Sequence, residues 1–346
     1  MKAHASFKLC IDNQVIDLKN LKGYNLGAKW QLSILNFVRD FLNDNASVKV
    51  QTSGSTGKPK EIELLKSRMR NSAEMTSSFL DLKEKDKALL CLSADYIAGK
   101  MMLVRALILG LEIHCVEPDT SFLKDINQHF AFSAMVPMQA MANIQWLSKI
   151  DMLIIGGGSL SQTDTDTLIR TNHNGLYQTF GMTETISHVA LKRISNPFYS
   201  ALKDISFFLS EKQTLVINAP LLLDNPITTN DLVELKNNTS FKWLGRADNI
   251  VNSGGYKIIP EKIEAEIGKV VNTSFFVYGI DDTRYGEKLI LFIENEKHDL
   301  NSTQLKGLNL NKFEIPKEIH GLKEFARTET GKVHRKKTVE IFLANI

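Results

Sequence analysis

The chain has 346 residues, of which 43% are hydrophobic and 23% charged, an ordinary composition for a globular protein that can hold two domains. The net charge of +3 gives no reason to expect a nucleic-acid partner, and the sequence contains neither an apolar run of the ~20 residues that span a membrane nor a secretory signal. Three scattered cysteines, Cys10, Cys91 and Cys115, lack metal-ligand spacing, so we expect reduced thiols in a cytoplasmic protein.

Residues 51–60, Gln-Thr-Ser-Gly-Ser-Thr-Gly-Lys-Pro-Lys, lie between a strand pattern at Val48 and Val50 and another at Glu61 to Leu65. Hydroxyls, glycines and lysines together suit a loop that holds a polyphosphate, although a surface turn can have the same composition. The segment differs from the loop of P-loop NTPases, because its glycines are closer together and Pro59 follows the lysine. The residues expected to contact phosphate are Thr52, Ser53, Gly54, Ser55, Thr56, Gly57, Lys58 and Lys60.

Between residue 47 and about 180, short apolar runs alternate with stretches of helical spacing, which predicts an α/β domain of layered sheets and helices. The apolar runs are Ala88–Leu92, Ile113–Val116, Ala131–Val136 and Met152–Ile155. The helical stretches are Lys66–Leu82, Gly99–Leu109, Met138–Leu147 and Ser161–Thr171. Shorter strand-like runs then predict a β-rich portion, antiparallel or barrel-like, at His188–Ile194, Thr214–Asn218, Leu232–Leu235 and Phe241–Leu244.

A break in composition at Gly245 to Asn249 separates this large domain from a small α+β lid domain. In the lid we expect a helix opening at Pro260 and further helices near 302–308 and 335–344. Strands are expected at Phe275–Tyr278 and Leu289–Ile293. The predicted boundaries are 1–245 for the N-terminal ATP- and acyl-binding domain, 246–250 for the hinge and 251–346 for the lid.

The loop at residues 51–60 resembles the phosphate loop of the adenylate-forming superfamily, which contains acyl-CoA synthetases, adenylation domains and luciferases. Ser55 replaces the usual Thr and Glu61 the usual Gly. Tyr177–Thr185 is similar to the superfamily's aromatic-Gly-x-Thr-Glu motif, and otherwise reads as a buried strand ending in a turn. The resemblance implies that Phe180 stacks on adenine, Thr183 donates to the α-phosphate and Glu184 binds Mg²⁺.

Gly156, Gly157 and Gly158 end an apolar strand and leave room for a flat ligand there, or form a tight turn. Together with the resemblance to the superfamily, these glycines look like the wall of the site that adenine and the acyl group share. Asp231, in a Thr-Asn-Asp rather than Thr-Gly-Asp sequence, aligns with the Asp that holds the ribose hydroxyls. Arg246 aligns with a second ribose or phosphate contact. Without the resemblance, Asp231 would be interpreted as a turn residue and Arg246 as a surface residue.

The resemblance also assigns residues to the hinge and to the lid. Asp248 falls at the hinge position. Lys332, in a segment without the usual Pro at Ala326, would bridge the carboxylate and the α-phosphate, although a solvated basic tail has a similar composition. The segment resembling the loop of the thiol tunnel contains Gly254, Gly255, Tyr256 and Lys257, and paired glycines also suit any β-turn.

Only about 50 residues precede the phosphate loop, and this short N-terminal portion is similar to the short bacterial o-succinylbenzoate–CoA ligases of menaquinone biosynthesis. Tyr96 stands where many relatives have His. Met101 and Met102 offer an apolar wall for a benzene ring, unless they belong to the core. Lys100 or Arg105 would pair with the carboxylate that is not activated, unless Arg105 is a solvated or ion-paired helix residue.

The resemblance therefore implies an AMP-forming acid–thiol ligase that uses ATP, Mg²⁺ and CoA on a small carboxylate. Three alternatives remain open: another aryl- or acyl-CoA ligase, an adenylation module that loads a carrier protein, and an inactive relative. The intact Thr183, Glu184, Asp231 and Lys332 argue against the last. The oligomeric state is not defined by the sequence, and a homodimer is compatible with it.

Overall fold

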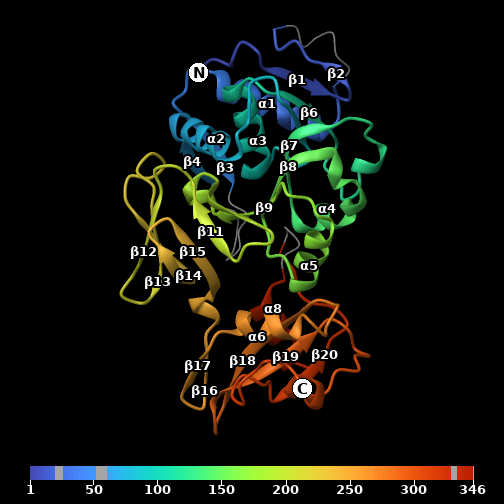
Figure 1. Cartoon of the computed structure of the whole chain (residues 1–346), viewed down its shortest axis with the longest axis vertical. Coiled ribbons are helices and arrows are strands. Elements are labelled where there is room, and N and C mark those ends of the chain that lie inside the picture. Colours follow the sequence, from blue (N-terminus) through green and yellow to red (C-terminus); the bar gives the residue numbers. More distant parts are fainter. Residues whose placement is uncertain (20–25, 52–60, 329–332, 346) are drawn as a thin grey trace.

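The computed structural model describes residues 1–19, 26–51, 61–328 and 333–345, which form a large sheet, a smaller sheet and a separate hairpin. Figure 1 shows the two sheets in separate lobes, one above the other. The large sheet ends at Arg246 and the small one begins at Val251, so a short connection links the lobes. The 3-10 helix η5 (Ala247–Asn249) lies in this connection.

The first half of the large sheet is parallel, in the order β9-β8-β7-β5-β6-β1, with β2 antiparallel at the edge. Its strands are β1 (Lys8–Ile11), β2 (Gln14–Val15), β5 (Lys87–Leu90), β6 (Glu112–Cys115), β7 (Phe130–Met135), β8 (Ile150–Ile155) and β9 (Leu176–Gly181). Because parallel strands end at one edge, the residues after β8 and β9 lie on the same side of the sheet, where open α/β sheets bind ligands.

The second half is antiparallel and continues the same sheet in the order β12-β13-β14-β15-β11-β10. Its strands are β10 (His188–Arg193), β11 (Phe198–Ala201), β12 (Ser206–Leu209), β13 (Thr214–Asn218), β14 (Ile227–Asn237) and β15 (Ser240–Arg246). The halves meet where β9 pairs antiparallel with β10. The turn between these strands contains the 3-10 helix η4 (Thr183–Thr185), so the predicted Thr-Glu motif lies at this junction.

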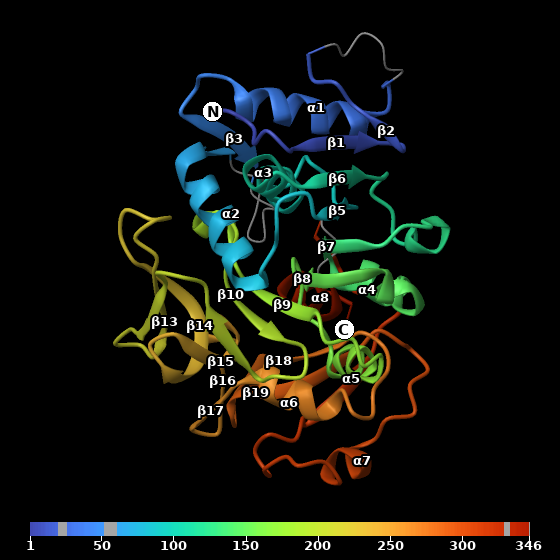
Figure 2. The ribbon, with the colours of Figure 1, turned by 45° about the horizontal axis from the view of Figure 1, so that its top comes forward.

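Helices cover both faces of the parallel strands (Figure 2). Successive strand side chains point to opposite faces, and in β5 Ala88 and Leu90 join one core whereas Leu89 joins another. The first core packs against α1 (Lys29–Leu42), α2 (Lys66–Leu80) and α3 (Ile97–Leu109). The second packs against α4 (Pro137–Ala142), α5 (Gln162–Arg170) and the 3-10 helices η2 (Leu123–Asp125) and η3 (Ile144–Lys149).

The separate hairpin consists of β3 (Ser47–Gln51) and β4 (Glu61–Leu65), which pair antiparallel on either side of the predicted phosphate loop. The small sheet has the order β17-β16-β19-β18, with β20 parallel to β19. Its strands are β16 (Val251–Ser253), β17 (Tyr256–Ile258), β18 (Phe275–Asp282), β19 (Gly286–Ile293) and β20 (Glu318–Gly321). Its helices are α6 (Pro260–Ile267), α7 (Ser302–Lys306) and α8 (Arg335–Leu343).

The elements predicted from periodicity are present, with one helix interrupted. The predicted helix Met138–Leu147 is observed as α4 followed by η3, because Asn143 ends α4. The amide oxygen of Asn143 accepts from the backbone N–H groups of Phe122 and Leu123, and its amide nitrogen donates to the carbonyl of Thr120. These bonds hold the preceding loop and replace continued helix.

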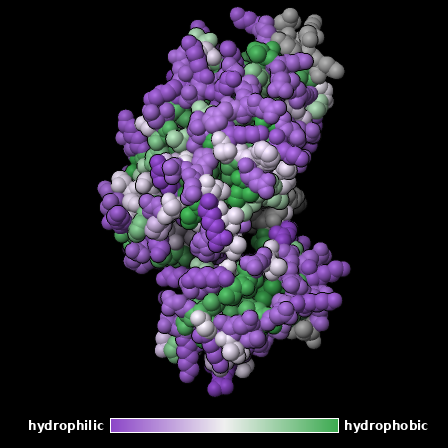
Figure 3. Space-filling view, turned by 45° about the vertical axis from the view of Figure 1, so that its right-hand side comes forward, coloured by the Kyte–Doolittle hydropathy of each residue, from purple (hydrophilic) through white to green (hydrophobic). Residues whose placement is uncertain are grey.

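Figure 3 shows one face of the molecule, on which hydrophilic residues predominate and apolar residues gather in a patch on the lower lobe. None of the helices in the described ranges is both long and apolar enough to cross a bilayer. The described cysteines Cys10, Cys91 and Cys115 are all buried free thiols, as the sequence predicts.

Candidate functional site

The predicted phosphate-loop residues 52–60 and Lys332 lie outside the described residues, and the structure describes only the segments that flank them. Gln51 pairs with Glu61 at the end of the β3–β4 hairpin. Arg327 and Val333 form an antiparallel bridge on the two sides of residues 329–332. Both predicted segments are therefore bracketed by paired backbone.

The three glycines after β8 differ in how strongly their surroundings favour glycine. A Cβ on Gly156 would come 2.2 Å from Oγ1 of Thr179 on β9, so a larger residue would require the Thr179 side chain to shift. Gly157 has φ +77°, in the left-handed region that favours glycine. Gly158 has ordinary space, because a Cβ added there would lie 3.5 Å from the ring of Pro137. The predicted role of this segment as a ligand wall stays a prediction.

The predicted adenine-stacking residue, Phe180, is half-buried at the end of β9. Its ring centroid lies 5.0 Å from that of Phe241 and 5.7 Å from that of Tyr199, in an edge-on and a tilted arrangement. These partners come from β15 and β11, so the ring is supported by the antiparallel half of the sheet. The resulting aromatic cluster holds the Phe180 ring in place, and its stacking on adenine stays a prediction.

The turn after β9 presents Glu184 outward on a backbone that Thr185 holds in place. The hydroxyl oxygen of Thr185 accepts from the N–H of Met182 at 3.0 Å and lies 2.8 Å from the carbonyl of Ser187. Thr183 is half-buried and Glu184 exposed. In the described part of the chain no hydrogen bond or ion pair engages the Glu184 carboxylate, and a free, exposed carboxylate fits a hard cation such as Mg²⁺.

Ile186, in the same turn, has a strained backbone that the sequence did not predict. Its φ of 67° and ψ of −53° are those of a γ-turn of the rare, strained kind. The N–H of Ser187 donates to the carbonyl of Thr185 at 2.7 Å and closes this turn. A β-branched residue rarely adopts positive φ, so burial of the Ile186 side chain, which is 2% exposed, must stabilise the conformation.

Asp231 and Arg246, predicted at the ribose, are cross-strand partners in the β14–β15 ladder. The Asp231 side chain is buried, and one of its oxygens accepts from the indole N–H of Trp243 at 2.9 Å. Arg246 Nη1 lies 4.0 Å from the same oxygen. Burial and the Asp231 charge raise the pKa of Tyr199. The carboxylate is therefore held in one orientation by Trp243 while Arg246 stays close.

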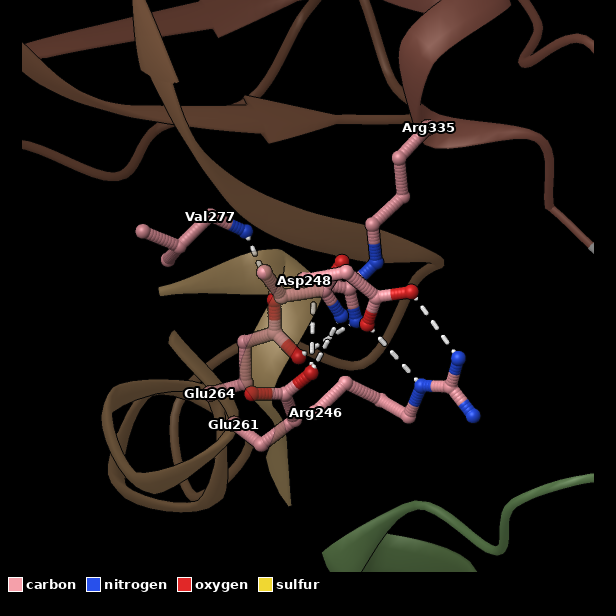
Figure 4. A network of polar contacts seen from close by, with 7 residues as sticks. Arg246, Asp248, Glu261, Glu264, Val277 and Arg335 are labelled. Carbon is pink, nitrogen blue, oxygen red and sulfur yellow. Dashed lines mark hydrogen bonds and ion pairs between the residues drawn. The ribbon is translucent and has the colours of Figure 1, made fainter. Parts of the chain in front are cut away.

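Asp248, predicted at the hinge, pairs with Arg246 two residues earlier. The guanidinium donates to both carboxylate oxygens, at 3.0 and 2.9 Å, and this hydrogen bonding lowers the pKa of Asp248 (Figure 4). Figure 4 also shows Arg335 of α8 paired with Glu264 of α6, at 2.8 and 2.9 Å. The first pair therefore lies at the connection between the lobes, and the second lies within the lobe of the small sheet.

Gly254, Gly255, Tyr256 and Lys257, predicted at the thiol tunnel, belong to the β16–β17 hairpin. Both glycines have positive φ, +59° and +84°, which a two-residue hairpin turn of type I′ requires. Tyr256 is half-exposed and its ring stacks on Phe313 at 3.9 Å between centroids. Lys257 is exposed. The hairpin alone accounts for the glycines, so the tunnel stays a prediction.

The predicted acyl-site residues differ in their surroundings. Tyr96 is exposed and lines a cavity of about 450 Å³ together with Lys29, Lys49, Asp95 and Lys100. The ammonium of Lys100 donates to the carbonyls of Ala94 and Asp95 at 2.7 and 2.8 Å. Its hydrogen bonds therefore hold the loop before α3, and burial lowers its pKa.

Arg105 is buried and, among the described residues, has no carboxylate partner. Its side chain is one of the largest that are fully buried, with 2% exposed. Nη2 donates to Oγ of Ser187 at 3.0 Å, whereas Nε is buried and has no hydrogen-bond partner within the described ranges. Burial lowers the pKa of Arg105 to about 9. A guanidinium in this setting, bonded to a serine in the same turn as Glu184, is suited to an anionic ligand.

One group of possible metal ligands was found outside this region, within the described ranges. Cys10, Glu112 and His114 on β1 and β6 bring their ligand atoms within 4.8 Å of one another. Glu112 already accepts from Lys8 at 3.2 Å and contacts Nε2 of His114 at 2.9 Å. These contacts satisfy the carboxylate without an ion.

Comparison with known proteins decides the family. A model of the AMP-binding enzyme family matches residues 28–206. This chain belongs to the AMP-binding enzyme family. A solved acyl-CoA synthetase (AMP-forming)/AMP-acid ligase II-like protein from Dyadobacter fermentans is 32% identical, with a TM-score of 0.62 over 92% of this chain and 97% of that one.

Curated relatives of this AMP-binding enzyme carry more specific names. The 2-succinylbenzoate–CoA ligase of Listeria monocytogenes is 27% identical, over 86% of this chain and 70% of its own length. A probable 2-succinylbenzoate–CoA ligase of Mycobacterium tuberculosis is 24% identical, over 88% and 87%. The o-succinylbenzoate coenzyme A synthetase of Bacillus subtilis, solved with ATP and magnesium, has a TM-score of 0.72 at 19% identity, over 84% and 69%.

These findings confirm the predicted membership of the adenylate-forming superfamily and support an AMP-forming ligase. The large mixed sheet with its helices fits the large domain of that fold. Within this AMP-binding enzyme, Phe180, Thr183, Glu184, Arg105 and the strand end at Gly156 gather around the β9–β10 junction. Ile186 and Ser187 complete this region, and neither was predicted.

Proposed function

We propose that this AMP-binding enzyme is an acid–CoA ligase that acts on o-succinylbenzoate in menaquinone biosynthesis, in the cytoplasm. It joins the carboxylate to AMP with release of pyrophosphate, and then transfers the acyl group to CoA with release of AMP. The observation that carries the choice of substrate is Arg105. The names of the curated relatives agree with this choice.

A buried arginine without a carboxylate partner is costly unless a ligand supplies the negative charge. O-succinylbenzoate has two carboxylates, of which only one is activated. Once the side chains that enclose Arg105 move aside, the other carboxylate can accept a charge-assisted hydrogen bond from Nε, which has no partner among the described residues. A monocarboxylic acid offers no such group, so Arg105 favours a dicarboxylic substrate. Lys100 is less suited, because two backbone carbonyls already occupy its ammonium.

The first half-reaction replaces the oxide of the carboxylate, a poor leaving group, by AMP, a good one. AMP is a good leaving group because it departs in the second half-reaction as a stable phosphate monoester. In-line attack on the α-phosphorus requires neutralisation of the departing pyrophosphate. We assign this task to the loop at 52–60, to Glu184 as the ligand of Mg²⁺ and to Lys332. The ion supplies Lewis-acid stabilisation of the phosphate charge when bound. Thr183 donates a hydrogen bond to the α-phosphate.

The nucleotide is held by residues from both halves of the large sheet. Asp231 accepts hydrogen bonds from the ribose diol, and Arg246 provides a second ribose or phosphate contact. Phe180 stacks on adenine, and Gly156, Gly157 and Gly158 leave space beside the ring. The buried Asp231, oriented by Trp243, supports this assignment because a fixed acceptor discriminates better than a mobile one.

The second half-reaction brings the thiol of CoA to the acyl carbon, where Lys332 acted before. We propose that residues 251–346 form a mobile lid that turns about a hinge at 246–250, with Asp248 at its centre. After rotation, Gly254, Gly255, Tyr256 and Lys257 would line the pantetheine tunnel. Tyr96 would gate the acyl pocket.

The test is an end-point mass spectrum of the purified protein with Mg-ATP, CoA and o-succinylbenzoate, beside benzoate, octanoate and a control without acid. O-succinylbenzoyl-CoA with AMP, absent from the controls, supports the proposal. AMP and pyrophosphate without a CoA product would indicate transfer to a carrier protein. Turnover of benzoate or octanoate at an equal rate would refute the substrate assignment, and no turnover with any acid would refute the activity.

A further inference from the structure

Four polar side chains form a continuous chain behind the proposed acyl site. They are Arg105 on α3, Ser187 and His188 at the start of β10, and Thr76 on α2. Arg105, His188 and Thr76 are 2%, 5% and 0% exposed, so the contacts are shielded from water. The proposed ligase chemistry gives no task to Thr76, Ser187 or His188.

The direction of each hydrogen bond follows from donors and acceptors. Oγ1 of Thr76 lies 2.9 Å from the carbonyl of Ser72, which can only accept, so the threonine hydroxyl gives its proton to that oxygen. The same Oγ1 lies 3.0 Å from Nε2 of His188. Having used its proton, Thr76 must accept here, and therefore Nε2 of His188 carries the hydrogen.

The other end of the imidazole is then defined as well. Burial, and secondarily the charge of Arg105, lower the pKa of His188 well below its usual value, so the ring is neutral. A neutral ring with its hydrogen on Nε2 has a lone pair on Nδ1. Oγ of Ser187 lies 3.4 Å from Nδ1 and accepts from Arg105 Nη2 at 3.0 Å. Ser187 therefore directs its own hydrogen to His188.

We propose that His188 is a positioning residue for recognition of the second carboxylate. Its Nε2–H tautomer, set by Thr76, turns the Ser187 hydroxyl so that an oxygen lone pair faces Arg105. This contact anchors the guanidinium through Nη2 and leaves the unpaired Nε for the substrate. The inference rests on the proposed function and adds to it a residue that does not touch substrate, cofactor or reacting atoms.

Two amide variants separate the two ends of the ring. In His188→Asn, the short side chain can place its amide oxygen near the position of Nδ1 and accept from Ser187. In His188→Gln, the longer side chain reaches the position of Nε2 and retains the contact with Thr76. We expect His188→Gln to raise KM for o-succinylbenzoate about tenfold, which corresponds to one hydrogen bond of ordinary strength. His188→Asn should stay close to wild type, and KM for ATP should not change in either variant.

A second measurement does not depend on turnover. In protein labelled with ¹⁵N-histidine, the two ring nitrogens of His188 are distinguished by long-range proton–nitrogen NMR and assigned by their loss in His188→Asn. We expect the Nε2–H tautomer at neutral pH, and its loss in Thr76→Val, which cannot accept. This readout reports the hydrogen-bond chain itself, which a purely packing role for the imidazole would not fix.

The outcomes separate this inference from the proposed function. An Nδ1–H tautomer in the wild type overturns the inference whatever the substrate. An equal rise in KM in both amide variants also overturns it, because packing rather than the Ser187 contact would then matter. If the wild type does not turn over o-succinylbenzoate, the proposed function fails and the substrate side of the inference fails with it, while the tautomer still decides the hydrogen-bond chain.

Discussion

Replacing Arg105 by Met should stabilise the protein while weakening its selection of dicarboxylic acids. Burial lowers the pKa of Arg105 from its ordinary value to about 9. At 1.36 kcal/mol for each unit of pKa, holding this charge in the substrate-free protein costs on the order of 5 kcal/mol. Met keeps much of the side-chain volume without the charge. After the lost contact with Ser187 is subtracted, we expect the free energy of unfolding to rise by about 1–4 kcal/mol.

The Arg105→Met variant also lacks the proposed hydrogen-bond donor to the second carboxylate of the substrate. A charge-assisted hydrogen bond contributes about 1.5–3 kcal/mol, so KM for o-succinylbenzoate should rise by about 10- to 150-fold. KM for a monocarboxylic aryl acid that the enzyme accepts should change little. Lys100→Met provides the matched control on the same helix, because its ammonium serves two backbone carbonyls and not the proposed ligand.

The assays are thermal unfolding of the substrate-free protein and steady-state kinetics with both acids. The stability difference should also depend on pH. Below about pH 9 both the folded and the unfolded chain hold the Arg105 proton, and the full cost of the buried charge is present. Above that pH, and up to the ordinary pKa of an exposed arginine, the unfolded chain binds more protons than the folded chain. The wild type should therefore gain stability relative to Arg105→Met as pH rises above about 9. A less stable variant that affects both acids equally would show that Arg105 is structural.

Further predictions concern the proposed nucleotide site and hinge. Lys332→Ala should abolish adenylate formation yet largely spare thioester formation from supplied acyl-adenylate; equal loss of both steps, measured separately, would remove Lys332 from the first. Asp248→Pro should slow the thioester step more than the adenylation step. Asp248→Ala also loses the ion pair with Arg246 but keeps backbone freedom, so it should not slow the thioester step selectively. Similar slowing of the thioester step in the two variants would place the hinge elsewhere. Glu184→Gln should lower kcat at least about a hundredfold at saturating Mg²⁺ without changing the Tm, and an unaltered Mg²⁺ dependence would argue against its role as a ligand. Asp231→Asn should raise KM for ATP about 10- to 100-fold in the same assay, and an unchanged KM would exclude a ribose contact.

The parallel strands and their helices were predictable because they are local and strongly patterned. Runs such as Ala88–Leu92 are apolar throughout, since helices cover both faces of the sheet. The strand β1 was not predicted, because Lys8–Ile11 becomes a strand only by pairing with Glu112–Cys115, far along the chain. Helix α1 was also missed, although Ile34, Phe37, Val38 and Phe41 have the helical spacing that would have indicated it.

The sequence motifs supplied candidate site residues, but not the contacts that tertiary packing makes between them. The sequence motifs gave Asp231 and Arg246 separate roles, and the β14–β15 pairing makes them neighbours. The contact between Thr76 and His188 joins residues 112 positions apart, so no local sequence pattern predicts it. The strained backbone of Ile186 has no sequence signal either, because isoleucine normally avoids positive φ.

Trp243 has a practical consequence beyond orienting Asp231. It is one of three tryptophans in the chain, with Trp30 and Trp146, and its indole N–H is bonded to the carboxylate proposed for the ribose. Indole fluorescence responds to the loss or redistribution of such a bond. A protein with Trp30→Phe and Trp146→Phe would therefore carry a single intrinsic optical reporter, from which nucleotide binding could be followed in real time without a label.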